Sequence, residues 1–358
     1  MAATTMHAVR LARFGDPSVL EYLEVDQPQP GPNDVLLKVH ATSVTSWDLK
    51  YREGVLQPPP GRKAFALPFQ LGREAAGEVA EAGSAVRRFS VGDRAVSMTC
   101  PACGHCPYCL RGLDNLCVGV GLPGHQRFGG YADYVVVAEK DLLPAPANLS
   151  YDELACCLWS YGTVWHMLFG RGRLQVGQSA LVTASSSGMG TACLQLLTYA
   201  GVGPIIALTG SASKVDALSE LGADHVFNYK TDDVPARVRD VTEGMGADVA
   251  IDNIGGPMLP LSMDCVRMGG TVVTASEHAG RRVEIDLVTL FAKHIDLLGS
   301  RASTRREQQL VLRLAAQGAI KPVISQVFPL SAAAEAHRTL EQAEHVGKLV
   351  LRPEHQLG

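Results

Sequence analysis

The sequence predicts an α/β protein that contains a doubly wound parallel sheet of the dinucleotide-binding kind. In the stretch 178–229, a short apolar run at 180–182 is followed by a turn of small residues and an apolar helical pattern that ends at Gly201. A second apolar run at 205–208 completes a strand–helix–strand unit. Further strand-like runs, at 248–252, 269–274 and 295–300, continue the alternation. Together these observations indicate a domain that binds a dinucleotide.

The turn between the first strand and the helix is the expected site of the cofactor's pyrophosphate. Ser185 and Ser187 occupy the first two glycine positions of G-x-G-x-x-G, and Gly190 occupies the third. The N-terminus of the following helix offers free N–H groups and the positive end of its dipole. We therefore expect Ser185, Ser187, Gly188, Met189 and Gly190 to bind the pyrophosphate, although an ordinary Ser/Gly-rich turn is the alternative interpretation.

The end of the second strand predicts the choice of cofactor. A carboxylate at this position would bind the ribose 2′-hydroxyl of NAD, but the sequence has Thr209, Gly210 and Ser211, followed by Lys214. A hydroxyl and an ammonium group suit a 2′-phosphate, which would repel a carboxylate. The sequence therefore favours NADPH, whereas the alternative for Lys214 is a solvated lysine in the first turn of a helix.

This segment resembles the zinc-containing alcohol dehydrogenase-like, or medium-chain dehydrogenase/reductase, superfamily and its quinone oxidoreductase-like branch. The resemblance implies that Gly210, Ser211, Lys214 and Tyr229 hold the 2′-phosphate of NADPH. The branch usually has glycine where Ser187 stands, so the phosphate turn is atypical. The resemblance also implies two domains: an NADPH-binding Rossmann domain over 161–298, and a mainly β, partly open barrel (GroES-like) catalytic domain over 1–160 and 299–358.

Composition and charge narrow the class of partner. The chain has 358 residues, a hydrophobic content of 46% and a net charge of −4, with no block of lysine and arginine. This composition suits a globular protein and argues against a nucleic-acid partner or an anionic membrane. The N-terminal residues lack the apolar segment of a secretory signal, so we expect a cytoplasmic protein with a small-molecule substrate, assembled as a homodimer or homotetramer.

Five cysteines between Cys100 and Cys117 predict a metal site. The spacing C-x2-C-x2-C-x7-C of Cys103, Cys106, Cys109 and Cys117 matches the structural zinc lobe of the superfamily, here about residues 98–118. Four thiolates close the coordination of one Zn²⁺ and leave no position for substrate. Cys100, Cys103, Cys106 and Cys109 form a rival set, but Gly104, Gly112 and Asn115 match the lobe only with the set that ends in Cys117.

The three positions that correspond to ligands of a catalytic zinc hold other residues. In zinc alcohol dehydrogenases they are cysteine, histidine and cysteine, whereas this chain has Thr45, Arg73 and Trp159. Arginine and tryptophan are not zinc ligands, so we expect no catalytic zinc. A displaced site that uses Cys156, Cys157, Glu74 and Asp48 is the alternative, although two buried, inert thiols are the better interpretation of the cysteines.

The residues around these positions are the candidate catalytic groups. In zinc relatives the aspartate that corresponds to Asp48 supports the ligating histidine, so we expect an ion pair between Asp48 and Arg73. Arg73 would then either hold the site together or stabilise a negative substrate oxygen. Thr45 and Tyr51 are further hydrogen-bond donors, and Trp47 and Trp159 would line an apolar site or pack in the core. His125 is expected to be a solvated loop histidine, with a histidine that faces the active site as the alternative.

The resemblance and the strand ends predict the surroundings of the nicotinamide. Thr163 matches a family threonine near the nicotinamide, with a helix-interior threonine that bonds back to its own chain as the alternative. Ile254, Gly255, Ala275 and Ser276 follow predicted strands, where a parallel sheet opens onto its ligand.

Without zinc, hydride addition to a quinone or to the β-carbon of an enone is favoured, because hydrogen-bond donors can stabilise the resulting phenolate or enolate. The alternatives are a biosynthetic tailoring reductase for an iminium or carbonyl, a zinc alcohol dehydrogenase with altered ligands, and a non-catalytic NADPH-binding protein.

Overall fold

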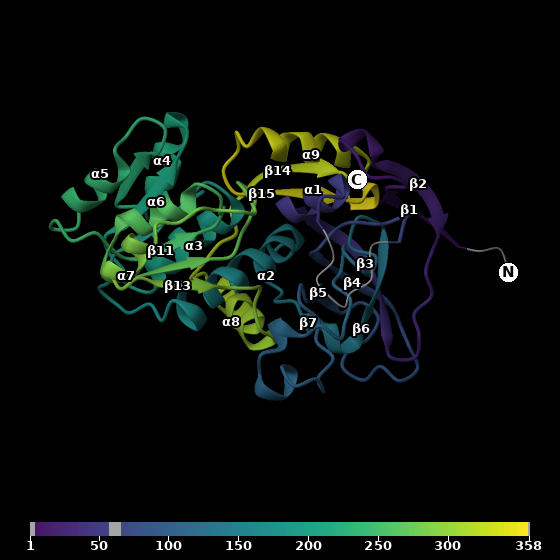
Figure 1. Ribbon diagram of the computed structural model, residues 1–358. Helices are drawn as coiled ribbons and strands as arrows, with labels where there is room; N and C mark the ends of the chain where they lie inside the picture. Colours follow the sequence, from purple (N-terminus) through teal and green to yellow (C-terminus); the bar gives the residue numbers. More distant parts are fainter. Residues whose placement is uncertain (1–3, 57–65, 357–358) are drawn as a thin grey trace. The chain divides into compact units, whose positions relative to one another are not determined.

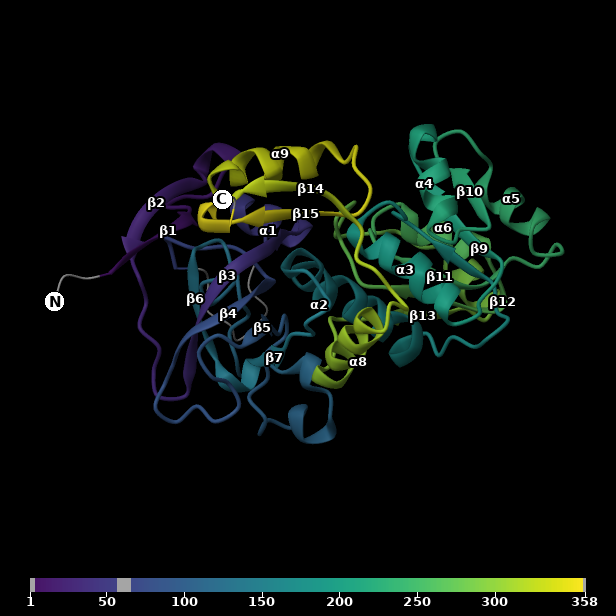
Figure 2. The same cartoon turned by 180° about the vertical axis from the view of Figure 1, so that it is seen from behind.

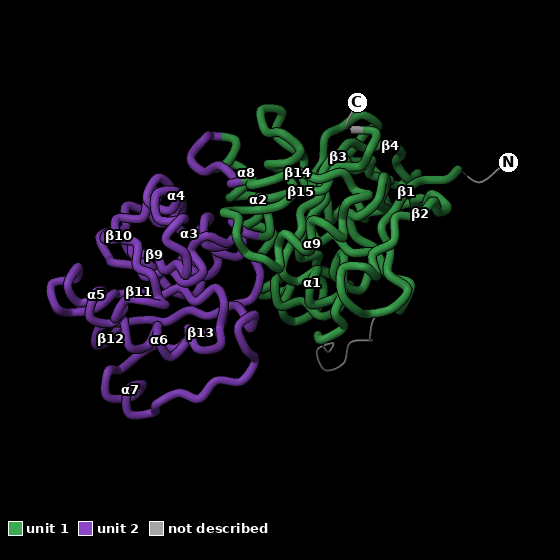
Figure 3. The backbone as a smooth tube through the Cα atoms, turned by 90° about the horizontal axis from the view of Figure 1, so that it is seen from above, with its two compact units in different colours: residues 1–159, 304–316, 324–358 green, residues 160–303, 317–323 purple. Residues whose placement is uncertain are grey.

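The computed structural model describes residues 4–56 and 66–356, and the chain divides into two compact units (Figure 3). Unit 1 comprises Met1–Trp159, Thr304–Ala316 and Ile324–Gly358, and unit 2 comprises Ser160–Ser303 and Gln317–Val323. Within residues 4–56 and 66–356, no helix combines the length and the apolarity that crossing a bilayer requires.

Unit 1 is built on a mainly antiparallel β-sheet, in agreement with the mainly β catalytic domain that the resemblance implies. The order in this sheet is β14-β15-β3-β4-β5-β7, and β6 pairs with β3 from outside that path. The strands are β3 (Asp34–Val44), β4 (Ala75–Ala82), β5 (Arg94–Ser97), β6 (Tyr134–Ala138), β7 (Leu142–Pro144), β14 (Ile324–Pro329) and β15 (Lys348–Arg352). A separate antiparallel pair consists of β1 (Thr5–Arg10) and β2 (Glu21–Asp26). The C-terminal strand β15 lies between β14 and β3, so segments from both ends of the chain form one sheet, in agreement with a catalytic domain that combines 1–160 with 299–358.

The helices of unit 1 lie beside this sheet. Figures 1 and 2 show α9 along β14 and β15. The helices are α1 (Ser46–Glu53), α8 (Arg305–Ala316), α9 (Ala333–Gln342) and the first part of α2 (Tyr151–Trp165). Short 3₁₀ turns are η1 (Pro17–Val19), η2 (Cys109–Arg111), η3 (Asp114–Leu116), η4 (Glu139–Asp141), η7 (Leu330–Ala332) and η8 (Glu354–Gln356). One apolar core joins β1, α1, α9 and β15 through buried residues that include Leu11, Leu49 and Leu349.

Unit 2 is a six-stranded parallel sheet in the order β10-β9-β8-β11-β12-β13. In chain order this is 3-2-1-4-5-6, the strand order of the Rossmann fold. The strands are β8 (Ala180–Val182), β9 (Ile205–Thr209), β10 (His225–Asn228), β11 (Ala247–Asp252), β12 (Val266–Thr274) and β13 (Asp296–Gly299). Every residue of β8 and β9 is buried, as expected for central strands covered on both faces.

Helices cross between these parallel strands and pack on the sheet (Figure 1). They are α3 (Gly188–Tyr199), α4 (Val215–Glu220), α5 (Val234–Asp240), α6 (Met258–Cys265) and α7 (Leu287–Ala292), with the 3₁₀ turn η6 (Ala212–Lys214) and the π-helical turn η5 (His166–Arg171) after α2. The sheet order reverses between β8 and β11, so the carboxyl ends of these two strands mark the crevice where such sheets bind ligands.

Candidate active site

The phosphate turn of unit 2 lies between β8 and α3. Gly190 is required there, because a Cβ atom on it would lie 2.2 Å from the carbonyl oxygen of Ala184. The Ser187 side chain caps α3 by accepting a hydrogen bond of 3.0 Å from the N–H of Gly190. Gly188 and Met189 lie in the first helical turn, whose N–H groups have no acceptor within the helix. Serine in place of the second glycine thus supplies a cap and leaves these N–H groups to bind an anion.

Ser185 has a structural role in this turn. Its side chain is completely buried, donates to the carbonyl oxygen of Val182 at 2.8 Å and accepts from the N–H of Leu208 at 3.0 Å. It therefore joins β8 to β9, and these two bonds occupy the hydroxyl group.

Lys214 connects the end of β9 to the phosphate turn. Its ammonium group donates to the hydroxyl of Ser186 at 3.2 Å, and the side chain is largely buried. The hydroxyl of Tyr229 lies over Gly210, where an added Cβ atom would approach it to 2.7 Å. Thr209 accepts a hydrogen bond of 3.2 Å from the N–H of Ser211. The residues predicted for the 2′-phosphate thus gather at the carboxyl end of one strand.

Two further residues belong to this group. Ser186 was not selected from the sequence, because only the fold shows that Lys214 bends back to the turn. Lys230 was also missed, and its Cε atom would lie 2.9 Å from a Cβ atom added to Gly210. Because Lys230 directly follows Tyr229 in the sequence, it could have been selected as a second cation near the 2′-phosphate.

The loops predicted to border the nicotinamide are organised by Asp252, which is completely buried at the end of β11. Its carboxylate accepts hydrogen bonds from the N–H of Ile254 at 3.2 Å and of Gly255 at 2.9 Å. It also accepts from the hydroxyl of Thr274, at the end of β12, at 2.8 Å. A Cβ atom on Gly255 would lie 2.4 Å from the carbonyl oxygen of Ser276, so the two loops pack closely.

Ala275 lies in the second of these loops and donates its N–H to the carbonyl oxygen of Asp252 at 3.3 Å. Thr163, also in unit 2, is buried, and its hydroxyl has no hydrogen-bond partner among the described residues. The alternative interpretation, a threonine bonded back to its own helix, is therefore wrong.

The four cysteines of the predicted structural site come together in unit 1. The sulfur atoms of Cys103, Cys106, Cys109 and Cys117 all lie within 4.8 Å of one another, and Cys100 is outside the group. A tetrahedral ion with Zn–S bonds of about 2.3 Å places sulfurs about 3.8 Å apart. The Cys106–Cys109 and Cys103–Cys109 distances are 3.5 Å and 3.9 Å, which fit such an ion.

Backbone N–H groups of His105 and Cys106 lower the pKa of Cys103 to about 6, which favours the thiolate that binds metal. Burial raises the pKa of Cys109 to about 12. Four thiols this close cannot all ionise without a cation, and a bound metal would resolve the conflict.

Asp48 does not form the predicted ion pair with Arg73. Its carboxylate accepts from the N–H and the hydroxyl of Thr45, at 2.8 Å and 2.6 Å, and from the N–H of Gly72 at 3.2 Å. Thr45 and Asp48 form a capping box at the start of α1, so helix capping directs this carboxylate away from the arginine. Burial raises the pKa of Asp48, and the hydrogen bonds from Thr45 and Gly72 oppose the shift.

Glu74 forms a buried ion pair with a residue from the far end of the chain. Its carboxylate lies 2.8 Å from the ammonium group of Lys348 and also accepts from the N–H of Trp159 at 2.9 Å. Burial alone would lower the pKa of Lys348, but the charge and the hydrogen bond of Glu74, together with smaller contributions from neighbouring groups, outweigh it, and that pKa is raised. Glu74 is thus unavailable to the displaced zinc site. Burial also raises the pKa of Cys156 and Cys157, which keeps these thiols neutral.

Arg73 lies between aromatic groups of unit 1. Its guanidinium carbon is 4.5 Å from the centroid of the Trp159 ring, and its Nη1 atom is 3.5 Å from the Tyr51 hydroxyl oxygen. His125 is only 6% exposed and stacks on Tyr51 with ring centroids 4.1 Å apart, so the expectation of a solvated loop histidine is wrong. Trp47 packs against the apolar core, with its ring centroid 6.0 Å from that of Tyr51.

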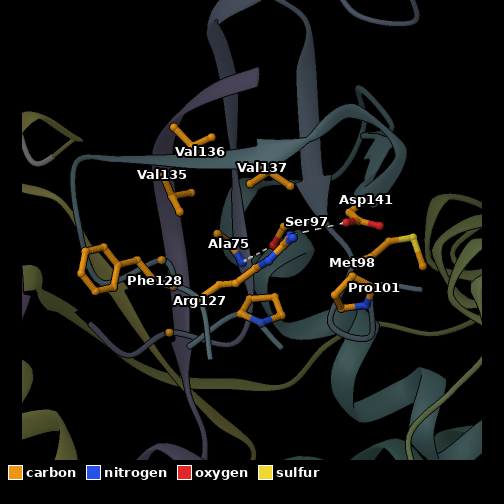
Figure 4. A pocket seen from close by; sticks show the side chains of 14 residues that line it. Ala75, Ser97, Met98, Pro101, Arg127, Phe128, Val135, Val136, Val137 and Asp141 are labelled. Carbon is orange, nitrogen blue, oxygen red and sulfur yellow. Dashed lines mark hydrogen bonds and ion pairs between the residues drawn. The ribbon is translucent and has the colours of Figure 1, made fainter. Parts of the chain in front are cut away.

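Unit 1 also contains a pocket, and Gly72, whose N–H binds Asp48, is among its lining residues (Figure 4). Its lining is mainly apolar and includes Val135, Val136 and Phe128, and none of the predicted catalytic residues contributes to it. At its polar end Arg127 lies 3.9 Å from Asp141, which is buried and also paired with a neighbouring lysine. Because its charged groups are paired with one another, this pocket is not assigned a function.

Comparison with known proteins identifies the family. Residues 31–147 match the alcohol dehydrogenase GroES-like domain, and residues 221–351 match the zinc-binding dehydrogenase family. The chain is 30% identical to a quinone oxidoreductase of Pseudomonas aeruginosa over 96% of this chain and 99% of that protein. It is also 30% identical to an NAD-dependent alcohol dehydrogenase of Saccharolobus solfataricus, over 97% and 100% of the two chains.

Solved structures agree with this assignment. A crystal structure of an NAD-dependent alcohol dehydrogenase superposes with a TM-score of 0.90 at 35% identity, covering 97% of this chain and 99% of that chain. A zinc-binding dehydrogenase from Sinorhizobium meliloti 1021, solved with NADP bound, has a TM-score of 0.86 at 29% identity, covering 98% and 100%. The chain therefore belongs to the medium-chain dehydrogenase/reductase superfamily of oxidoreductases, which includes the quinone oxidoreductases.

Proposed function

We propose that this protein is an NADPH-dependent reductase that works without a catalytic zinc and transfers hydride to a quinone or to the activated C=C bond of an enone. Support for NADPH comes from the end of β9, where Thr209 replaces the acid that would favour NAD. Lys214 and Tyr229 would hold the 2′-phosphate, and the first turn of α3 would hold the pyrophosphate. NADPH supplies a hydride when it is bound.

The residues of unit 1 would stabilise the oxygen that becomes negative on reduction. Thr45 is not suited to this role, because its hydroxyl proton is committed to Asp48 at 2.6 Å. Arg73 can only donate, so the Tyr51 oxygen accepts in their contact and the phenol proton is not used there. Burial raises the pKa of Tyr51 against the opposing charge of Arg73, so this phenol remains a proton carrier at neutral pH. Tyr51 and Arg73 are therefore the candidate donors to an enolate or phenolate.

The four-cysteine site would hold one structural Zn²⁺. Its donor set is complete without water or substrate, so the ion would order the segment around η2 and η3 rather than act on substrate. Among the residues that the structure describes, no other group of three or more His, Cys, Asp or Glu side chains brings its ligand atoms together in this way.

The observation that carries the proposal is a cationic Arg73 against the Trp159 ring where zinc relatives place two metal ligands. A steady-state assay with NADPH and matched panels of quinones, enones and simple aldehydes tests it, with zinc content measured on the same sample. We expect turnover with quinones or enones at one zinc per chain. Turnover confined to simple alcohols and aldehydes, at two zincs per chain, would show that the protein is an alcohol dehydrogenase with altered ligands. Tight NADPH binding without turnover would indicate a non-catalytic binder.

A further inference from the structure

Arg73 is a buried cation that forms no ion pair with a described residue of unit 1, although the Asp48 carboxylate lies near enough to act on its charge. The residue is only 4% exposed. Its guanidinium carbon lies 4.5 Å from the centroid of the Trp159 ring, and its Nη1 atom lies 3.5 Å from the Tyr51 hydroxyl oxygen. A hydrogen bond of 3.5 Å is long and contributes little. The positive charge is therefore held in place by aromatic groups and is not neutralised by them.

The carboxylates near Arg73 in the sequence are committed to other partners. Glu74 pairs with Lys348 at 2.8 Å, and Asp48 accepts three hydrogen bonds from Thr45 and Gly72. Among the described residues of unit 1, no carboxylate oxygen lies within 4.0 Å of an Arg73 nitrogen. The segments 1–3, 57–65 and 357–358 contain no aspartate or glutamate side chain.

One edge of the guanidinium also lacks an acceptor. Among the described residues, the buried Nε–H of Arg73 has no hydrogen-bond partner, and the side-chain hydrogen bond of this residue comes from Nη1 on the other edge. Buried polar groups in folded proteins are nearly always hydrogen-bonded, and an unpaired buried charge is costlier still. The Nε–Nη2 edge is also the edge that binds a carboxylate through two parallel hydrogen bonds.

The stacking on Trp159 makes this edge selective. Contact with the indole face fixes the plane of the guanidinium and covers one side of it, which favours an anion that presents two oxygens in that plane and adds little bulk above it. We propose that Arg73 forms a binding site for a planar carboxylate, so that the position of a metal cation in zinc relatives binds an anion in this chain. This inference deepens the proposed function: the preferred substrates would be flat, conjugated carbonyl compounds that carry a carboxylate.

Benzoate and its neutral isostere benzamide provide a direct test, because they differ in charge and hardly in shape. Binding of each to the full-length protein is measured by calorimetry, without NADPH and without turnover. We expect benzoate to bind at least tenfold more tightly than benzamide. The variant R73M should lose at least tenfold in benzoate affinity and change benzamide affinity by less than twofold. R73K keeps the charge but loses the planar guanidinium group. Its affinity for benzoate should lie between those of the wild type and R73M.

Arg13, which is exposed in the same unit, provides the matched control, and R13M should bind benzoate like the wild type. Equal binding of benzoate and benzamide, or wild-type benzoate affinity in R73M, would overturn the proposal. If R73M does not fold, R73K provides the test. An unchanged benzoate affinity in R73K would contradict the proposal that the planar guanidinium group binds the carboxylate. NADPH affinity, measured in the same samples, reports separately on the proposed cofactor.

Discussion

The proposed preference for NADPH predicts that removing the Lys214 ammonium group makes the protein bind both nicotinamide cofactors similarly. The side chain is 7% exposed, and its Nζ atom lies 3.2 Å from the Ser186 hydroxyl, beside the turn expected to hold phosphate. A hydrogen bond to a charged group contributes about 1.5–3 kcal/mol. Since about 1.4 kcal/mol corresponds to a tenfold change, we expect Lys214→Met to weaken NADPH binding by about 10- to 150-fold. NADH affinity should change little, because NADH has no 2′-phosphate.

Methionine is the preferred replacement because it keeps most of the buried aliphatic stem. Calorimetric titration with both cofactors gives the two dissociation constants, and a thermal melt shows whether the fold is intact. Lys321→Ala, which removes an exposed lysine of the same unit, should alter neither affinity. Equal losses for NADPH and NADH, or equal wild-type affinities for the two, would refute the assignment of the 2′-phosphate site.

Two further predictions concern the metal site and pH. Cys117→Ser should lower both the zinc content, from about one ion per chain, and the melting temperature. Cys100→Ser should retain the zinc. Metal analysis of the two variants decides whether Cys117 is the fourth ligand. His337 is buried, with its ring nitrogens 3.3 Å from Arg52 and 3.0 Å from the Tyr131 hydroxyl, and its pKa is lowered to about 3, mainly by burial. Between about pH 6.5 and 3, His337 binds a proton in the unfolded state but not in the folded state. The free energy of unfolding should therefore decrease as the pH is lowered through this window, by up to about 1.4 kcal/mol per pH unit. Denaturant titrations should show a smaller loss in His337→Gln, and an identical pH dependence would contradict the assignment.

The Rossmann domain could be predicted well, because apolar strand-like runs recur along this part of the chain. The apolar runs at 180–182 and 205–208 and the intervening small-residue turn became β8, β9 and the start of α3. The resemblance predicted that the C-terminal segment belongs to the catalytic domain, but not that β15 pairs with β3, about 300 positions away, since nothing local links these segments.

Side-chain partners were harder to predict, and the errors have physical causes. Thr45 and Asp48 have the T-x-x-D spacing of a capping box, but the family role of the aspartate suggested a pair with Arg73 instead. Helix capping is a local interaction and prevailed over the pairing expected from zinc relatives. The partner of Glu74, Lys348, lies 274 residues away, so no sequence pattern near Glu74 could indicate it. His125 was misjudged because a loop position in the sequence does not show that the loop folds inward onto Tyr51.

The most direct test of the central claim is to follow the hydride. NADPH carrying deuterium at C4 of the nicotinamide ring is incubated with the protein and an enone, and the product is analysed by NMR. Reduction without a catalytic zinc predicts deuterium on the β-carbon of a saturated ketone, in protein that contains one zinc per chain. Deuterium on the carbinol carbon of an allylic alcohol would contradict it, because that product requires stabilisation of an alkoxide, the task that zinc performs in the alcohol dehydrogenases.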